Sequence, residues 1–168
     1  MRHAGDVVAV RSDDLRPPKL LPTPGNWPLP IVYEDEHLLI LNKPAGMTAH
    51  ASNFLPDTPT VAGALAWQRG ADFVFHPVNR LDRGTSGLMA VAKHAHAHER
   101  LQHQLRTGEL ARTYLAVCQG VPVPRRGCVD QPISRLPGSV LKRQVCPQGA
   151  RARTHYAVER TGAGRSLV

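Results

Sequence analysis

The pattern of apolar and polar positions begins with two short β-type runs. Residues 31–33 and 38–41 are apolar, and the acidic residues 34–36 separate them. Two such runs around a short polar turn predict a β-hairpin. The segment NKPAGM, residues 42–47, follows the hairpin and carries the Pro and Gly of a tight turn.

Two later stretches have the periodicity of helices. Residues 60–68 place Val61 and Leu65 four positions apart, and Thr60 is a suitable N-cap. From residue 94 onward the apolar residues also recur every four positions, which predicts an amphipathic helix ending near Gly108. These residues are Ala97, Leu101 and Leu105.

The remaining apolar runs predict strands. Residues 73–75 and 88–92 flank a polar stretch, and residues 110–119 follow a strand pattern around Tyr114. Shorter strands are expected within the Pro-, Gly- and Arg-rich tail and beyond it, at residues 140–141, 144–145 and 153–159. Strands interspersed with two helices favour an α+β domain over a doubly wound sheet.

Length and composition refine this picture. The 168 residues, 42% of them hydrophobic, suffice for one globular domain with a core. Residues 16–30 contain six prolines. Because proline fixes φ and removes a backbone donor, we expect this stretch to be an extended linker.

The charge is unevenly distributed along the chain. The whole sequence has 21 Lys and Arg against 13 Asp and Glu, but residues 125–168 alone have nine basic and two acidic residues. A basic stretch of this kind binds polyanions, of which nucleic acid is the commonest. Arg also outnumbers Lys by 17 to 4, so a compositional bias of the genome explains the charge equally well.

The cysteines and the hydropathy pattern point to the cytoplasm. Cys118, Cys128 and Cys146 are odd in number and form no C-x-x-C motif, which predicts free thiols. No segment approaches the about 18 apolar residues of a membrane span, and the opening residues have too short an apolar run for a signal peptide. We therefore expect a cytoplasmic protein with no membrane partner.

The polar stretch HPVNRLDRGTSGLM, residues 76–89, holds the candidate chemistry. Asp82 lies between Arg80 and Arg83 on a loop flanked by apolar runs. A carboxylate beside a guanidinium stays ionised and oriented, which suits a nucleophile or a base. Thr85 and Ser86 add hydroxyl groups at the same place. The alternative is purely structural: an Arg–Asp pair that staples a turn, which chemistry alone favours.

Four segments together resemble the RluA-type family of pseudouridine synthases. RLDRGTSGLM resembles the family signature around its catalytic Asp, and VYEDEHLLILNKPAGM resembles its first motif. ARTYLAVCQG, residues 111–120, and ISRLPGSVLKRQVCPQGARARTHYAV, residues 133–158, resemble its later strands and basic hairpins. The resemblance covers residues 31–168 and implies an α+β catalytic domain with a mainly antiparallel mixed sheet.

The resemblance implies that the protein isomerises uridine to pseudouridine in ribosomal or transfer RNA, without a cofactor or a metal. Asp82 would be the catalytic carboxylate, Arg80 would help to extrude the target nucleotide, and Tyr114 would stack on the flipped uracil. The further residues expected to bind substrate or RNA are Arg83, Thr85, Ser86, Arg143, Arg151 and Arg153. Without the resemblance, Arg80 could merely pair with Asp82, and Tyr114 could be a core residue.

The sequence also departs from the family pattern. Many members have His where this chain has Asn79, and an acidic residue where it has Gly84. Residues 4–10 resemble the last strand of a small RNA-binding module, and the family continues beyond a strand like RSLV to an Arg that pairs with the catalytic Asp. We therefore expect a remnant of that module in residues 1–15, the linker, and the first part of a catalytic domain in residues 31–168, whose edge beside residues 165–168 lies uncovered.

Other signals leave alternatives open. His94, His96, His98 and His103 could suggest a metal site, but no H-E-x-x-H motif supports it, so we expect a solvated helix face that can touch RNA. Lys43 and Gly46 lack the spacing of a phosphate loop, and the family resemblance implies that they form a structural turn beside the active site.

Three functions are compared on this basis. A monomeric pseudouridine synthase explains all four segments, and an inactive RNA-binding fragment explains the same matches. A hydrolase that uses Asp82 with a histidine leaves the other three segments unexplained.

Overall fold

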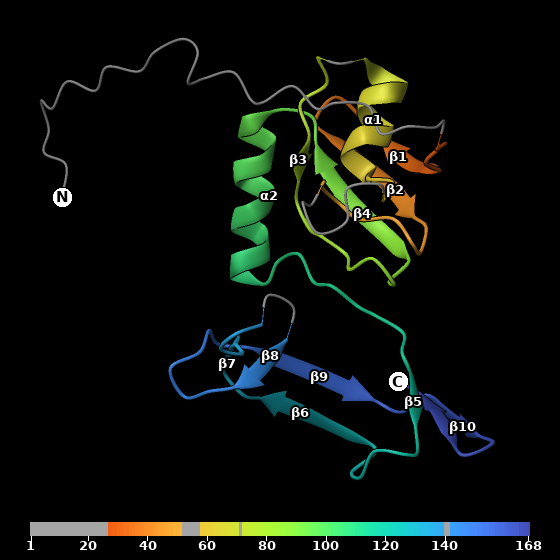
Figure 1. Ribbon diagram of the computed structural model, residues 1–168, viewed down its shortest axis with the longest axis vertical. Coiled ribbons are helices and arrows are strands. Elements are labelled where there is room, and N and C mark those ends of the chain that lie inside the picture. Colours follow the sequence, from red (N-terminus) through yellow and green to blue (C-terminus); the bar gives the residue numbers. More distant parts are fainter. Residues whose placement is uncertain (1–26, 52–57, 71, 140–141) are drawn as a thin grey trace, which may run out of the picture. The chain divides into compact units, whose positions relative to one another are not determined.

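The computed structural model describes residues 27–51, 58–70, 72–139 and 142–168, which belong to two compact units (Figure 1). The first unit runs to Ala111 and the second is Arg112–Val168. The predicted module remnant, most of the predicted linker and the predicted strand at residues 140–141 lie outside the described residues. The two units contain helices together with antiparallel sheets, which confirms the α+β class.

A four-stranded antiparallel sheet organises the first unit. Its strand order is β1-β2-β4-β3, and the strands are Ile31–Glu34 (β1), Leu38–Lys43 (β2), His76–Pro77 (β3) and Gly87–Ala92 (β4). The predicted hairpin is confirmed as β1 and β2. Asp35 closes its turn, because Oδ1 accepts hydrogen bonds from the backbone N of His37 and of Leu38, both at 2.7 Å.

The two predicted helices are also confirmed. Helix α1 spans Val61–Arg69, and the Thr60 hydroxyl caps it by accepting from the backbone N of Gly63 at 2.9 Å. Helix α2 spans Ala95–Thr107 and ends at Gly108, whose φ of 82° is left-handed and therefore suits glycine. No helix among the described residues is long and apolar enough to cross a membrane.

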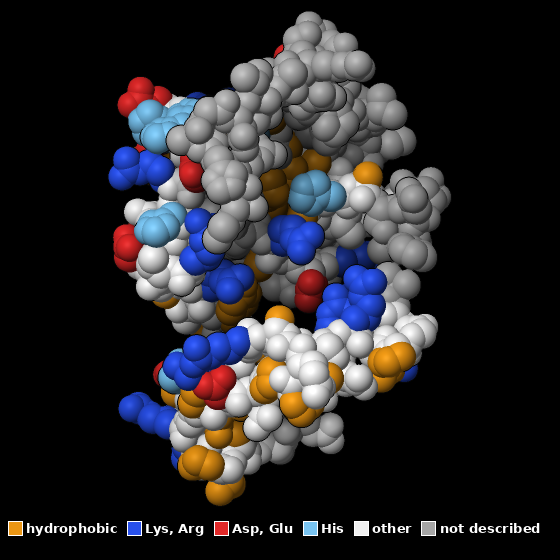
Figure 2. All heavy atoms as spheres, turned by 90° about the vertical axis from the view of Figure 1, so that its left-hand side faces the viewer, with side chains coloured by type: hydrophobic (Ala, Val, Ile, Leu, Met, Phe, Trp, Pro, Cys, Tyr) orange, Lys and Arg blue, Asp and Glu red, His pale blue; other side chains and the backbone are white. Residues whose placement is uncertain are grey.

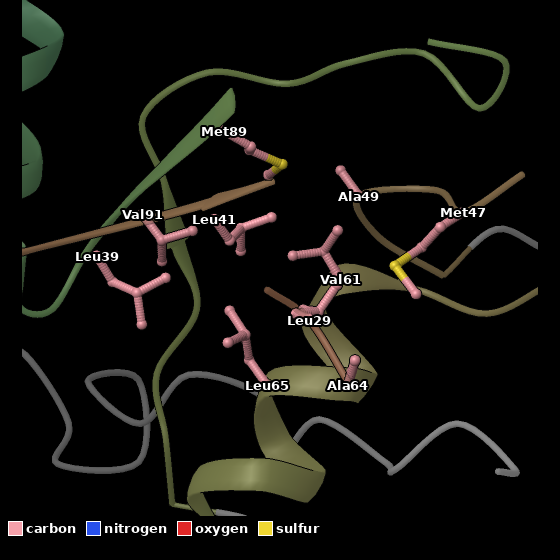
Figure 3. Packing of buried hydrophobic residues seen from close by; sticks show 10 residues of the cluster. All are labelled: Leu29, Leu39, Leu41, Met47, Ala49, Val61, Ala64, Leu65, Met89 and Val91. Atoms are coloured by element: carbon pink, nitrogen blue, oxygen red, sulfur yellow. The ribbon is translucent and has the colours of Figure 1, made fainter. Parts of the chain in front are cut away.

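Helix α1 covers one face of the sheet and forms the main core (Figure 3). Side chains alternate along β2 and β4, so Leu39 and Leu41 point to the same face as their partners Val91 and Met89. The buried members of this cluster are Leu29, Leu39, Leu41, Met47, Ala49, Val61, Ala64, Leu65, Met89 and Val91. Truncating any of the large ones to Ala is expected to cost about 2–5 kcal/mol.

Helix α2 packs against β3 and β4 around a smaller cluster. Its buried members are Val78, Ala92 and Ala97, with Ala90, Leu101, Leu105 and Leu110 packed around them. The amide of Gln102 reinforces the contact by donating to the carbonyl of Val78 at 2.8 Å. The helix therefore fixes the segment that leads into the Arg80–Asp82 loop.

The expected strand at residues 73–75 is wrong. Phe73 and Phe75 are half-buried against the main core, and only His76 and Pro77 join the sheet. Proline has no N–H, so Pro77 donates no hydrogen bond to the ladder, which passes to Val78. The loop bearing Asp82 is therefore held by one two-residue strand before it and by β4 after it.

The second unit consists of three small antiparallel sheets. Their strand pairings are β10-β11-β5, β6-β9 and β7-β8. The strands are Val117–Gln119 (β5), Arg126–Asp130 (β6), Ile133–Arg135 (β7), Arg143–Val145 (β8), Arg153–Ala157 (β9), Arg160–Gly162 (β10) and Arg165–Leu167 (β11). Among the described residues of this unit only Ser166 is buried, so backbone ladders rather than a core hold it together.

In this unit one predicted strand and one predicted sheet edge are corrected, and two predicted strands are confirmed. The strand expected over residues 110–119 covers only β5, because regular pairing begins where Ala116 and Val168 exchange two backbone hydrogen bonds. Strand β11 is paired on both sides, so the uncovered edge expected beside residues 165–168 is wrong. The strands expected at residues 144–145 and 153–159 correspond to β8 and β9.

Candidate active site

The loop between β3 and β4 carries Arg80 and Asp82 and is anchored at its start by Asn79. The Asn79 side chain accepts a hydrogen bond from the backbone N of Ala90 at 2.7 Å and donates to the carbonyl of Leu88 at 3.4 Å. Val78 already donates to Ala90 at 2.8 Å. The side-chain amide of Asn79 thus continues the hydrogen-bond ladder to β4 beyond the last backbone bond from Val78. The sequence did not reveal this role.

Between these anchors the loop exposes its charged side chains. Leu81 is buried, whereas Arg80 and Asp82 on either side of it are exposed. The backbone N of Thr85 donates to the carbonyl of Asp82 at 3.0 Å and closes a turn there. The buried side chain of Leu81 anchors the loop to the core, so the backbone that carries the exposed Asp82 is fixed.

The turn after β2 lies against the residue that follows Asp82. The backbone N of Gly46 donates to the carbonyl of Arg83 at 2.7 Å, and the Arg83 guanidinium donates from Nε to the carbonyl of Gly46 at 3.3 Å. Gly46 has a φ of 90°, which side chains rarely tolerate. Two segments about forty positions apart in the chain, NKPAGM and RLDRG, therefore meet at one site.

Lys43 fixes this turn from inside. It is fully buried, and its ammonium donates to the carbonyls of Pro44 at 3.0 Å and Met47 at 2.8 Å. Burial lowers the pKa of Lys43, and the nearby carboxylate of Asp82 acts in the opposite direction. The prediction of a structural turn is confirmed, because a buried ammonium bound to carbonyls is not available to a phosphate.

The expected pairing of Asp82 with its neighbouring arginines is wrong. In the part of the chain that the structure describes, the ion pairs within 4.0 Å include neither Asp82 nor Arg80 nor Arg83. The turn at Asp82 directs Arg83 towards Gly46 instead. The structural alternative, an Arg–Asp staple, fails for the same reason.

The charge of Arg80 lies close enough to His50 to affect the pKa of that histidine. Burial lowers the pKa of His50, and the positive charge of Arg80 lowers it further. The His50 ring lies edge-on to Phe75, with 5.0 Å between ring centroids. The sequence-based interpretation assigned no role to His50 because it lies thirty residues from the loop.

Tyr114 belongs to the second unit and lies in its extended first segment. Its side chain is 51% exposed and that of Leu115 is 74% exposed. The alternative of a core residue is therefore wrong, and the ring is available to stack on a ligand.

The prediction of a solvated histidine face is wrong for His94 and His98. His94 caps α2, and His98 lies 3.2 Å from the carbonyl of Pro77 through Nε2, so both are half-buried against the protein. His96 and His103 are exposed as expected. Among the described residues no group of three or more His, Cys, Asp or Glu could hold a metal ion.

The basic residues expected to bind RNA are exposed, as are Lys and Arg side chains elsewhere on both units (Figure 2). Arg143 lies on β8 and Arg151 precedes β9. Arg153 is bound to Asp130, with Nε at 2.7 Å and Nη2 as a second donor to the same oxygen. The three cysteines are free thiols, as predicted.

The chain is similar in sequence and fold to known proteins. A family model described as RNA pseudouridylate synthase matches residues 37–168. The uncharacterized RNA pseudouridine synthase YjbO of Bacillus subtilis is 41% identical over 133 residues, which are 78% of this chain and 47% of YjbO. Ribosomal large subunit pseudouridine synthase D of Escherichia coli is 39% identical over 137 residues, 80% of this chain and 42% of that protein.

The chain spans about half the length of the curated relatives that it matches. Among solved structures, human RNA pseudouridylate synthase domain containing 4 superposes with a TM-score of 0.63 at 25% identity, over 82% of this chain and 56% of that one. The human domain containing 1 protein has a TM-score of 0.61 at 22% identity, over 83% and 57% of the two chains, and supports the fold alone. This chain belongs to the RNA pseudouridylate synthase family, as its resemblance to the RluA-type enzymes implied.

Proposed function

We propose that the protein is an RNA pseudouridine synthase in which Asp82 is the catalytic carboxylate. The observation that carries the proposal is the placement of Asp82: an exposed carboxylate on a loop whose backbone is tied to β4 through Asn79 and to the turn after β2 through Arg83. An exposed group on a fixed backbone can meet a substrate without reorganising. The reaction breaks the bond from N1 of uracil to C1′ and forms one from C5, and it requires no cofactor.

Other residues of the loop would bind the nucleotide. Arg80 is exposed beside Asp82, so its planar cation can enter the RNA helix and replace the stacking lost when the uridine is extruded. Arg83, Thr85 and Ser86 would contact the substrate around Asp82. Tyr114, with half of its side chain exposed, would stack on the flipped base.

The proposed substrate is ribosomal RNA. Relatives at 39–40% identity from Escherichia coli and Xanthomonas campestris are named ribosomal large subunit pseudouridine synthases. Arg143, Arg151 and Arg153, all exposed in a unit with nine basic and two acidic residues beyond position 124, would bind the phosphate backbone. We further propose a monomer in the cytoplasm, where the free thiols stay reduced.

The experiment is tritium release from RNA labelled at C5 of uracil, because bond formation at C5 expels that hydrogen. Asp82→Asn in the protein that carries this sequence should abolish release while RNA binding persists, since Asn keeps the shape but loses the charge. Asp72→Asn is the matched control, because Asp72 is an exposed aspartate of the same unit. Near-full activity of Asp82→Asn would show that Asp82 is not the catalytic carboxylate.

A further inference from the structure

His50 lies at the end of a short segment that is fixed against the core. Met47 and Ala49, which precede it, belong to the main core shown in Figure 3. Helix α1 also holds the segment, because the backbone N of Ala62 donates to the carbonyl of Ala49 at 3.1 Å. The Thr48 hydroxyl donates to the carbonyl of His50 itself at 3.0 Å. The side chain of His50 is exposed, so an exposed ring is carried here by a fixed backbone.

The same segment contacts the chain on both sides of Arg80. Before Arg80 in the sequence, the ring of Phe75 lies with its centroid 5.0 Å from that of His50, and the two ring planes are 66° apart. After Arg80, the backbone of Arg83 accepts a hydrogen bond from Gly46 at 2.7 Å. His50 and Arg80 are therefore neighbours, and both side chains are exposed.

The ring of His50 presents an uncharged face to a ligand. In an edge-to-face contact a ring uses either its edge or one of its faces, so Phe75 leaves at least one face of the His50 ring uncovered. Burial and the nearby positive charge of Arg80 both lower the pKa of His50, so the ring is neutral at neutral pH. A neutral ring forms no ion pair with a phosphate, whereas its face can stack on a nucleobase.

We infer that His50 stacks on a second base of the RNA, the neighbour of the uridine that is extruded towards Asp82. The inference rests on the proposed function, in that the ligand is RNA, and it adds a residue that binds the substrate. Arg80 would occupy the gap that the uridine leaves, so the base beside that gap is the one that meets His50. Unpaired bases of RNA are bound by stacking on aromatic side chains, histidine included. His50 would therefore select RNA in which the nucleotide next to the target is unpaired.

The test measures the affinity of the protein that carries this sequence for unmodified transcripts of large-subunit ribosomal RNA, over a range of salt concentrations. Stacking of one base changes the affinity by about 5- to 150-fold. His50→Ala should therefore bind at least about fivefold more weakly at every salt concentration. Its log–log salt slope should equal that of the parent protein, because a neutral ring releases no counterion. His50→Phe keeps a ring face and should bind within about twofold of the parent.

Two further variants separate the ring face from packing and from position. His50→Leu fills the space beside Phe75 but has no planar face, so it should bind RNA as weakly as His50→Ala. Tyr33→Ala removes another exposed ring of the same unit, which is 49% exposed. Tyr33 lies on β1, at the opposite edge of the sheet from β3, so this variant should bind RNA as tightly as the parent.

A fluorescent ring at the same position reports the contact directly. In His50→Trp a stacked base should quench the emission of the new indole. RNA should therefore quench this variant more than the parent protein, whose tryptophans are Trp27 and Trp67. Equal quenching in both proteins would overturn the inference. So would parent-like affinity of His50→Leu, or a salt slope reduced by about 0.7–0.9 in His50→Ala, which would indicate a phosphate contact instead.

The stacking contact and the proposed catalysis fail separately. Tritium release tests Asp82, whereas affinity, its salt slope and fluorescence quenching test His50. A parent protein that released no tritium would contradict the proposed function. An active parent whose His50→Ala variant bound RNA equally tightly would contradict the role of His50 alone.

Discussion

His37 and His94 share a hydrogen bond that joins the β1–β2 turn to the start of α2. Nδ1 of His37 lies 2.9 Å from Nε2 of His94. Nδ1 of His94 accepts from the backbone N of Ala97 at 3.2 Å, so the neutral His94 ring carries its proton on Nε2 and donates to His37. His37 in turn reaches Glu36 from Nε2 at 3.1 Å. One imidazole therefore serves both as a helix cap and as a link between two elements.

The His94→Ala variant should lose both functions. Removing an N-cap costs about 0.5–2 kcal/mol, and the bond to His37 is lost with it. Chemical denaturation should show a lower midpoint with an unchanged slope. His94→Asn restores the cap but not the link and should recover part of the loss, whereas exposed His96→Ala should leave the midpoint unchanged.

Stability should fall on mild acidification because of His76. Burial lowers the pKa of His76, and the electrostatic effect of the nearby His98 and His94 side chains lowers it further. Between the lowered folded pKa and the ordinary pKa, His76 binds a proton in the unfolded chain but not in the folded protein. The contribution of His76 to stability is therefore complete above its ordinary pKa of about 6.5 and is lost as the pH falls from there through the lowered folded pKa.

Unfolding temperatures measured between neutral and mildly acidic pH check this expectation. His76→Gln cannot be protonated, so its curve should be flatter than that of the parent protein over that range. A variant curve parallel to the parent curve would assign the acid sensitivity to other groups.

Replacement of Lys43 by Met should destabilise the turn after β2. Methionine fills the space of the aliphatic stem but leaves the carbonyls of Pro44 and Met47 without their donor, which costs about 1–3 kcal/mol. The same turn holds Arg83, so the rate of tritium release should fall more than RNA affinity does. Lys93→Met is the control, because Lys93 is only partly buried, pairs with Glu34 near the surface and should cost less than about 1 kcal/mol. Equal losses in both variants would contradict a special role for the buried ammonium.

Gly149→Ala should loosen the β7–β8 ribbon. The new methyl group would lie 2.5 Å from the backbone of Ile133, and backbone atoms cannot rotate away as a side chain can. Such overpacking costs about 1–3 kcal/mol. RNA affinity should fall with stability in this variant. Gly84→Ala is the matched control, because an added Cβ there would meet nothing within 4 Å. If the Gly149→Ala protein were as stable as this control, the backbone around Gly149 and Ile133 would be shown to adjust to the methyl group at no cost.

Much of the first unit followed from local patterns. The hairpin, the cap at Thr60 and the repeat of Ala97, Leu101 and Leu105 are short-range features, and the structure has them where they were expected. Alternation of side chains along β2 and β4 also fixed which residues enter the core. These elements are determined by neighbours within a few positions along the chain.

The details of the candidate site depended on contacts between distant segments. Asn79 is hydrogen-bonded to β4, Gly46 is hydrogen-bonded to Arg83, and the charge of Arg80 lowers the pKa of His50. None of these relationships has a local signature in the sequence. In the second unit the apolar pattern is weak because almost nothing is buried, so it could not define the extent of β5 or the register that opposes Arg135 and Arg143.

The scarcity of buried residues in the second unit has a consequence for its resistance to proteases. Cleavage by trypsin requires an arginine or lysine on a backbone that can open locally, and opening is easiest where few apolar contacts resist it. Residues 125–168 combine nine such side chains with a single buried residue, Ser166, among those described. Trypsin would therefore cut first at the peptide bonds that follow the same arginines that would bind RNA. Bound RNA would protect these bonds from cleavage.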